Sequence, residues 1–160
     1  MGRVAMIHVA LQGEKQMSVK FVVGFDGSAA SQNALDFAIA RAKAQGGRVV
    51  VAHVLEWSPY SFLTPQEIEE RHGRRSQELA RAEEMILLPA VQKATDAGVE
   101  TAGVVRYGHI AQTLCKICKE EGAHQIVVGR HGHSEMASRV FGSVAGSLVQ
   151  VAPVPCTVVP

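Results

Sequence analysis

The stretch IVVGRHGHSEMASRVFGS, residues 126–143, contains the pattern that indicates both the fold and a ligand site. An apolar run is followed by a loop with Gly129 and Gly132, and Gly142 and Ser143 open the last apolar segment. This order predicts a strand, a glycine-containing loop and a helix whose N-terminus is capped by Ser143. Free N–H groups and the helix dipole favour an anion there, and glycines let a ligand approach the backbone closely. We therefore expect this loop to hold the phosphates of a nucleotide.

Valine-rich apolar runs occur throughout the chain, and they have the composition of strands buried on both faces. They are Val19–Phe25, Val49–Leu55, Val99–Arg106, Gln125–Val128 and Cys156–Val159. Helical patterns lie between them, from Ser28 to Ala42, Thr64 to Ala97, Ile110 to Glu121 and Ser143 to Val151. The alternation predicts an α/β fold with a doubly wound parallel sheet, in which ligands bind beyond the carboxyl ends of the strands. The turn at Asp26 should then face the Gly129 loop across one crevice.

The composition limits the classes of partner. The chain has 160 residues, enough for one domain with a full core, and 16 Lys and Arg against 15 Asp and Glu. Near-neutral charge gives no support for nucleic-acid binding, and no apolar run is long enough to cross a membrane. Three cysteines without a recognisable secretory segment favour a reducing, cytoplasmic location.

Two segments are less regular. Residues 1–17 are predicted to be an N-terminal extension, either disordered or an extra edge strand, ahead of a nucleotide-binding domain over 18–160. Thr64-Pro65-Gln66-Glu67 combines a capping box with proline at the first helical position. The helix from there to Ala97 should be disturbed near Gly73 and Pro89. Its charged first half is predicted to be a solvated face, with a partner-binding flap as the alternative.

The spacing of the glycines matches a known pattern. Gly129, Gly132, Gly142 and Ser143 fit G-x2-G-x9-G-[S/T], and with them the chain resembles the ATP-binding branch of the universal stress protein family. Further matches are the strand end at Asp26, the pair His53-Val54, the turn Gly108 to Ala111 and the closing PVPCTVV. The resemblance covers Ser18 to Pro160.

The resemblance implies a Rossmann-like, five-stranded parallel sheet in the order 3-2-1-4-5 with helices on both faces. It also implies a stress-response protein that binds ATP, ADP or AMP, and a homodimer formed through the C-terminal strand. The nucleotide site implied by the family comprises Gly24, Phe25, Asp26, Val54, Gly129, Arg130, Gly132, His133, Gly142, Ser143 and Val144.

Each residue has an implied role. The glycines, Ser143 and Val144 would hold ribose and phosphates, and Val54 would form an adenine slot with the backbone of residues 24 and 25. Asp26 would bind ribose hydroxyls or a nucleotide-bound Mg²⁺ or Mn²⁺. The family often has Ser or Thr where this chain has Ala145. We expect the positive charge of Arg130, His131 and His133 to compensate for the missing hydroxyl.

Other candidate chemistry has simpler explanations. Cys115 and Cys118 form a CxxC inside a predicted helix, where buried thiols are the favoured interpretation over redox or metal chemistry. His53 lies in a buried strand and is interpreted as a hydrogen-bonded core histidine. No nucleophile–base pair stands out beside Asp26, so we predict no catalytic residue and little or no turnover. The alternatives are a Mg-dependent ATPase or phosphotransferase, and a nucleotide-free dimeric interaction module.

Overall fold

The computed structural model describes residues 5–9, 18–56, 64–133 and 142–160, with the backbone alone for 5–9. In these residues a six-stranded sheet has the order β1-β4-β3-β2-β5-β6. The strands are β1 (Ala5–Val9), β2 (Lys20–Gly24), β3 (Arg48–Leu55), β4 (Glu100–Tyr107), β5 (Gln125–Gly129) and β6 (Cys156–Val159). Strands β2 to β6 are all parallel, so the predicted order 3-2-1-4-5 is confirmed. Strand β1 adds an antiparallel edge strand beside β4.

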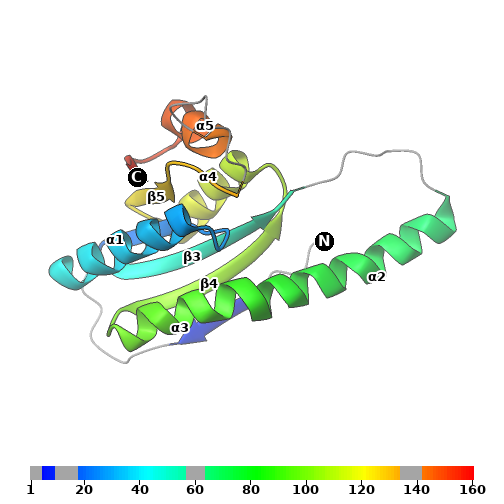
Figure 1. Cartoon of the computed structure of the whole chain (residues 1–160), viewed down its shortest axis with the longest axis horizontal. Coiled ribbons are helices and arrows are strands. Elements are labelled where there is room, and N and C mark those ends of the chain that lie inside the picture. The colour runs from blue at the N-terminus through cyan, green and yellow to red at the C-terminus, as the bar shows by residue number, and fades with distance from the viewer. Residues whose placement is uncertain (1–4, 10–17, 57–63, 134–141) are drawn as a thin grey trace.

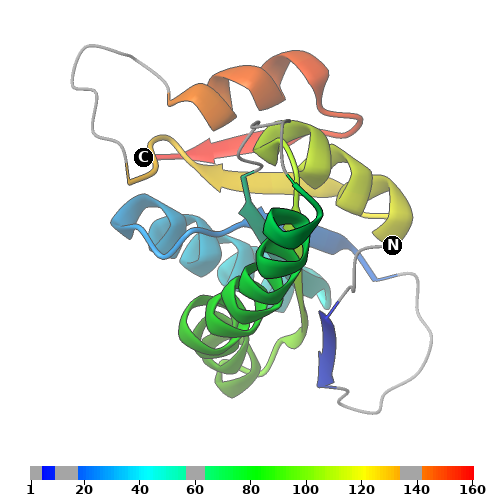
Figure 2. The same ribbon diagram turned by 90° about the vertical axis from the view of Figure 1, so that its right-hand side faces the viewer.

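Helices cover both faces of the sheet (Figures 1 and 2). They are α1 (Ala29–Gln45), α2 (Pro65–Ala82), the π-helix η1 (Glu83–Leu87), α3 (Leu88–Asp96), α4 (Ile110–Glu121) and α5 (Ser143–Val151). One core packs α1, η1 and α3 against the sheet, and a second packs α4 and α5 against the other face. Alternate residues of the central strands point into the two cores, as in β2, where Phe21 and Val23 join the first and Val22 the second. None of the helices in the described part of the chain is long and apolar enough to span a membrane.

Local sequence signals set several helix ends. Ser28 caps α1 by accepting a hydrogen bond from the Ser31 N–H, and Gly46 ends it in the left-handed conformation. Thr64 and Glu67 form the predicted capping box at the start of α2. The cap at α5 was predicted wrongly. Its N-cap is Gly142, in an extended conformation, and Ser143 is the first residue of α5, without a capping hydrogen bond.

The long helical segment departs from α-geometry at one of the two expected places. Gly73 lies inside α2 with open space around it, so the disturbance predicted there is wrong. An exposed helix tolerates one glycine at a cost of about 1 kcal/mol. The disturbance expected near Pro89 is confirmed as the π-helix η1, where the N–H of Leu88 donates to the carbonyl of Glu83. Proline lacks the N–H that would continue the α-helical pattern, and the π-turn immediately precedes it.

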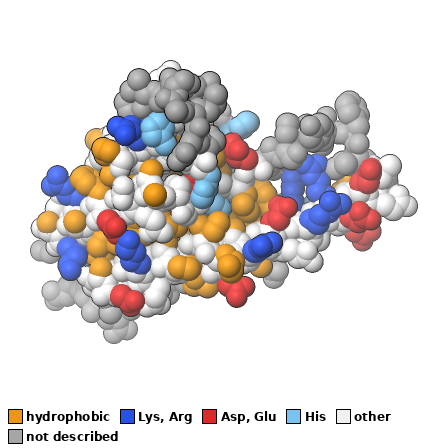
Figure 3. Space-filling model, in the orientation of Figure 1, with side chains coloured by type: hydrophobic (Ala, Val, Ile, Leu, Met, Phe, Trp, Pro, Cys, Tyr) orange, Lys and Arg blue, Asp and Glu red, His pale blue; other side chains and the backbone are white. Residues whose placement is uncertain are grey.

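The helix α2 extends away from the body of the sheet (Figure 1). Charged side chains cover this projecting part (Figure 3), and most residues between 66 and 81 are exposed. The predicted solvated face is therefore confirmed. Near its C-terminal half, α2 is fastened to the sheet by the Tyr107 hydroxyl, which donates to Glu78 at 2.7 Å. The Arg75 guanidinium lies 5.5 Å from the centre of the same ring.

Candidate nucleotide-binding crevice

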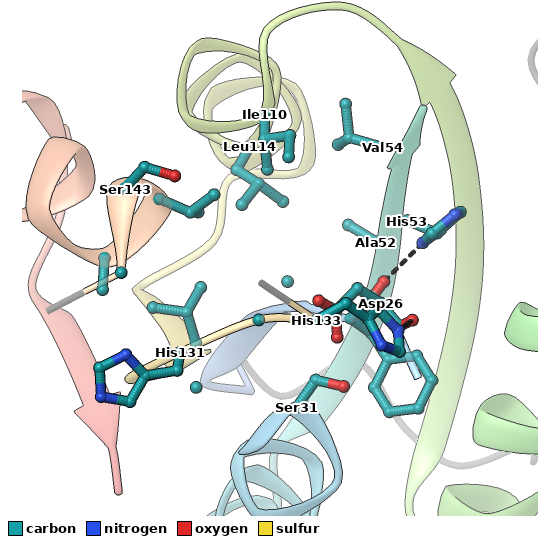
Figure 4. Close-up of a pocket in the computed structure, with 18 of the residues that line it drawn as sticks. Asp26, Ser31, Ala52, His53, Val54, Ile110, Leu114, His131, His133 and Ser143 are labelled. Carbon is teal, nitrogen blue, oxygen red and sulfur yellow. Dashed lines mark hydrogen bonds between the residues drawn. The ribbon is translucent and has the colours of Figure 1, made fainter. Parts of the chain in front are cut away.

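A cavity of about 320 Å³ lies at the carboxyl ends of β2, β3 and β5, where the winding of the sheet reverses (Figure 4). All of the residues predicted for the nucleotide site line it. The sequence interpretation did not assign a ligand contact to the following lining residues: Ser31, Ala52, His53, Glu56, Ile110, Leu114 and Val128. Segments separated by more than a hundred residues of sequence therefore meet at one cavity of the size that small ligands occupy.

One end of the cavity is apolar. Val54 from β3 lies there with Ile110 and Leu114 from the first turns of α4 (Figure 4). Gly24 lets α4 pack closely, because a Cβ atom at this position would lie 2.9 Å from Leu114 Cδ1 and from Val128 Cγ1. A flat apolar group such as a nucleobase fits a slot with these walls.

The backbone of Phe25 contributes to this slot, while its side chain is 4% exposed in the core on the other face of the sheet. Its N–H donates to the Ala52 carbonyl at 2.8 Å. Its carbonyl lies 2.7 Å from Nδ1 of His53, which is buried (Figure 4). A carbonyl oxygen only accepts, so Nδ1 carries the hydrogen. The interpretation of His53 as a hydrogen-bonded core histidine is confirmed.

Asp26 lies in the turn after β2, and its carboxylate is held in place. Oδ1 accepts a hydrogen bond from the Ser28 N–H at 2.9 Å. Burial by itself raises the pKa of Asp26, but hydrogen bonds from Ser28 and Ser31 and the charge of His133 outweigh it and lower the pKa below its usual value. The group is therefore an anion at neutral pH, with acceptor oxygens suited to hydroxyl groups or a cation.

The loop after β5 forms the floor of the cavity and is joined to elements on both sides. The Arg130 N–H donates to the Val159 carbonyl at 2.7 Å, and the Gly142 N–H donates to the Arg130 carbonyl at 2.8 Å. On the other side, His133 Nε2 lies 2.8 Å from the Asp26 carbonyl. The loop thus connects the turn after β2 with β6 and with the start of α5.

The glycines of the loop are needed for different reasons. A Cβ atom at Gly129 would lie 2.6 Å from the backbone carbon of Ala30, so this glycine allows α1 to pack against β5. A Cβ at Gly132 would lie 2.9 Å from Asp26 Oδ2, inside the cavity. Gly129 is therefore required by the fold, whereas Gly132 shapes the ligand site.

The N-terminus of α5 closes the cavity opposite Asp26 (Figure 4). The first N–H groups of any α-helix lack intrahelical partners and favour an anion. Ser143 is exposed beside them, and Val144 also lines the cavity. Ala145 is 1% exposed, and its methyl group packs in the apolar core under α4 and α5. This burial accounts for an apolar residue at the position where the family often has a hydroxyl.

Two further predictions concern metals and thiols. Among the residues that the structure describes, no group of three or more His, Cys, Asp or Glu could hold a metal ion. Cys115 and Cys118 are buried in α4, and burial raises the pKa of both thiols. They are the buried thiols that the helical pattern predicted.

Some lining residues carried a signal that the sequence interpretation did not use. Alternation along β3 places Glu56 on the same side as Ala52 and Val54, all of which line the cavity. Ile110 and Leu114 are spaced four residues apart at the start of α4, so they share one face of that helix. The contribution of Ser31, on the first turn of α1, follows from its position beside Asp26 in the folded chain.

The sheet order and the crevice define the chain as a doubly wound α/β protein with a preformed small-ligand cavity at the topological switch point. The model of the universal stress protein family matches residues 17–160. The chain therefore belongs to the universal stress protein family.

Two curated relatives illustrate the match. The universal stress protein YxiE of Bacillus subtilis is 31% identical over 144 residues, which cover 88% of this chain and 97% of the relative. A universal stress protein of Mycobacterium bovis is 27% identical over 158 residues. In that case the match covers 91% of this chain and 49% of the relative, so the chain spans about half the length of that protein.

Solved structures share the fold. The universal stress protein of Archaeoglobus fulgidus in complex with dAMP superposes with a TM-score of 0.60 at 22% identity, covering 91% of this chain and all of that one (100%). A family member from Arabidopsis thaliana with bound AMP gives a TM-score of 0.59 at 15% identity, covering 88% of this chain and 90% of that one. Both of these structural neighbours are described with an adenine nucleotide.

Proposed function

We propose that this chain is an ATP-binding universal stress protein, a regulatory module whose bound nucleotide biases its conformation or partners with little or no turnover. One observation carries the proposal. The Asp26 turn, the end of β3, the Gly129–His133 loop and the N-terminus of α5 converge on one cavity of about 320 Å³. An apolar slot at one end and free helix N–H groups at the other match the two ends of a nucleotide.

The proposal gives each wall a role. The base lies between Val54 and the α4 residues, and the ribose lies near Asp26. The phosphates lie against the Gly129–His133 loop and the N–H groups of Ser143 and Val144. Arg130 adds positive charge on the same loop. Two solved structures of the same fold are described with AMP and dAMP, which supports an adenine nucleotide as the ligand class.

The residues of the crevice fit a nucleotide-bound Mg²⁺ or Mn²⁺ rather than a resident metal. Asp26 offers one carboxylate, and its Oδ1 already accepts the Ser28 N–H. Mg²⁺ commonly binds through one or two carboxylates together with phosphates and water. In this proposal Asp26 holds such an ion only while the nucleotide supplies further ligands, and the ion would neutralise phosphate charge.

Slow turnover follows from what surrounds the phosphate end. Hydrolysis needs a positioned base or water and extra charge stabilisation at the transferring phosphoryl group. Among the described lining residues, the carboxylates are Asp26 and Glu56. Glu56 directly follows the end of β3, and Asp26 accepts a hydrogen bond from the Ser28 N–H. In this proposal neither carboxylate activates a water at the N-terminus of α5.

The proposal includes a homodimer in the cytoplasm. Strand β6 forms one edge of the sheet and is parallel to β5 on its paired side. Beside it, Val149 and Val151 on α5 are each 56% exposed. A second copy that adds to β6 would extend the sheet and cover these valines.

Turnover distinguishes this function from its rivals. The purified protein should release a bound adenine nucleotide on denaturation, identified by mass spectrometry, and the stripped protein should rebind ATP. Phosphate release from ATP should stay near the background rate with Mg²⁺ present. Steady turnover that disappears in Asp26→Asn would support a Mg-dependent ATPase instead. A protein that neither carries nor binds a nucleotide would support an interaction module.

A further inference from the structure

The side chain of His133 joins the two walls of the cavity within the protein itself. Its Nε2 lies 2.8 Å from the backbone carbonyl of Asp26, which is 107 residues earlier in the sequence. The carbonyl oxygen has no hydrogen, so Nε2 is the donor in either charge state of the ring. Figure 4 shows the His133 ring beside Asp26, whereas His131, on the same loop, lies away from it.

The hydrogen bonds of Arg130 hold the first part of the loop, and the hydrogen bond of His133 holds its second part. Arg130 fixes the first part of the loop to β6 through Val159 and to α5 through Gly142. The second part faces the turn after β2, where Gly132 permits close approach to Asp26. Within the described residues, the hydrogen bond that joins this second part to the turn comes from His133.

We propose that His133 is a positioning residue, a clamp that fastens the Gly129–His133 loop to the turn after β2 and so preforms the crevice before a nucleotide binds. This inference rests on the proposed function and changes the role first expected for His133. Its donor is used on a backbone carbonyl, so its contribution to binding is the ordering of the loop rather than charge delivered to phosphate. Ordering a site before binding reduces the entropy lost on binding.

Two substitutions separate these roles. His133→Gln retains an N–H donor at a similar distance from the backbone but carries no positive charge. His133→Leu has a similar volume and no donor. His131→Leu, on the same loop, is the matched control, because His131 points away from Asp26 (Figure 4).

The first measurement needs no ligand. Hydrogen exchange of loop peptides, followed by mass spectrometry on the nucleotide-free protein, should be faster in His133→Leu than in the wild type. The Gln variant and His131→Leu should exchange at about the wild-type rate. Equal exchange in His133→Leu and wild type would overturn the clamp, as would a Gln variant that behaves like the Leu variant.

The second measurement uses calorimetry with AMP, ADP and ATP. Because one hydrogen bond is lost, we expect His133→Leu to lower the affinity for each nucleotide by a similar factor, roughly two- to tenfold. The Gln variant should retain wild-type affinity. A loss that grows from AMP to ATP, with no rescue by Gln, would overturn the proposal in favour of a phosphate-binding charge. If the wild type binds none of the three, the proposed function fails, and the exchange measurement still decides whether His133 orders the loop.

Discussion

Gly129 and Gly132, in the Gly129–His133 loop, should respond differently to substitution by alanine. In Gly129→Ala the new methyl carbon would lie 2.6–2.8 Å from backbone and Cβ atoms of Ala30 on α1. In Gly132→Ala it would lie 2.9 Å from one atom, Oδ2 of the Asp26 side chain. Gly146→Ala in α5 is a control, because no atom of the described residues around it lies within 4 Å of the added carbon.

The sizes of the effects follow from what must move. Separating α1 from β5 disturbs a packed core, and overpacking of this kind costs about 1–3 kcal/mol. For a protein of this length that corresponds to a fall in melting temperature of roughly 2–12 °C. Displacing the partly buried Asp26 side chain in Gly132→Ala costs less, and the reduced freedom of the unfolded chain offsets this cost by about 0.4–1 kcal/mol. Gly146→Ala should stabilise the protein by up to about 1 kcal/mol.

Chemical denaturation and calorimetric titration with ATP together test this reasoning. We expect Gly129→Ala to lose stability, and Gly132→Ala to keep its stability but bind ATP more weakly. Gly146→Ala should show neither loss. A Gly129→Ala protein as stable as the wild type would refute the packing argument. A Gly132→Ala protein with unchanged ATP affinity would refute the placement of the ligand beside Asp26.

Three further predictions test other parts of the structure. The pKa of Asp26 is lower in the folded protein than its unfolded value of about 3.9, so the ionised carboxylate stabilises the fold above that pH. This stabilisation is lost as the pH falls through the folded pKa. The stability difference between wild type and Asp26→Asn should therefore shrink below about pH 4. Burial and the hydrogen bond to Glu78 raise the pKa of Tyr107 to about 12, so ultraviolet titration should show one tyrosine ionising near that pH, and this late step should vanish in Tyr107→Phe. In Gly103→Ala the added carbon would lie 2.8 Å from Leu87 Cδ2, which should cost about 1–3 kcal/mol in chemical denaturation, and a neutral result would contradict the tight packing of the π-helix.

Much of the fold could be predicted because residues that begin or end helices and strands occur along the chain. The bounds of α4, α5 and β6 agree with the sequence prediction, since glycine and proline residues mark where these elements begin and end. The π-helix was the exception. Pro89 indicated a break, but no sequence pattern indicated a π-helix over Glu83–Leu87, whose Leu87 packs close to Gly103 in the folded core.

The candidate site was predicted in its residues but not in its internal contacts. The glycine spacing identified the loop, and the alternation of strands and helices placed it opposite Asp26. No sequence pattern indicated that His133 would bond the Asp26 carbonyl, because that contact joins segments 107 residues apart. For the same reason the motif could not show that Gly129 serves packing against α1 while Gly132 serves the cavity.

Calorimetric titration of ATP into the nucleotide-free protein, with Gly132→Val as the paired variant, tests the central claim most directly. Gly132 is exposed, and among the described residues the atom close to an added Cβ belongs to the Asp26 side chain, so the variant should remain folded. The proposed crevice predicts saturable binding of one ATP per chain and loss of that binding in the variant. Absence of binding to the wild type, or equal binding to both proteins, would contradict it.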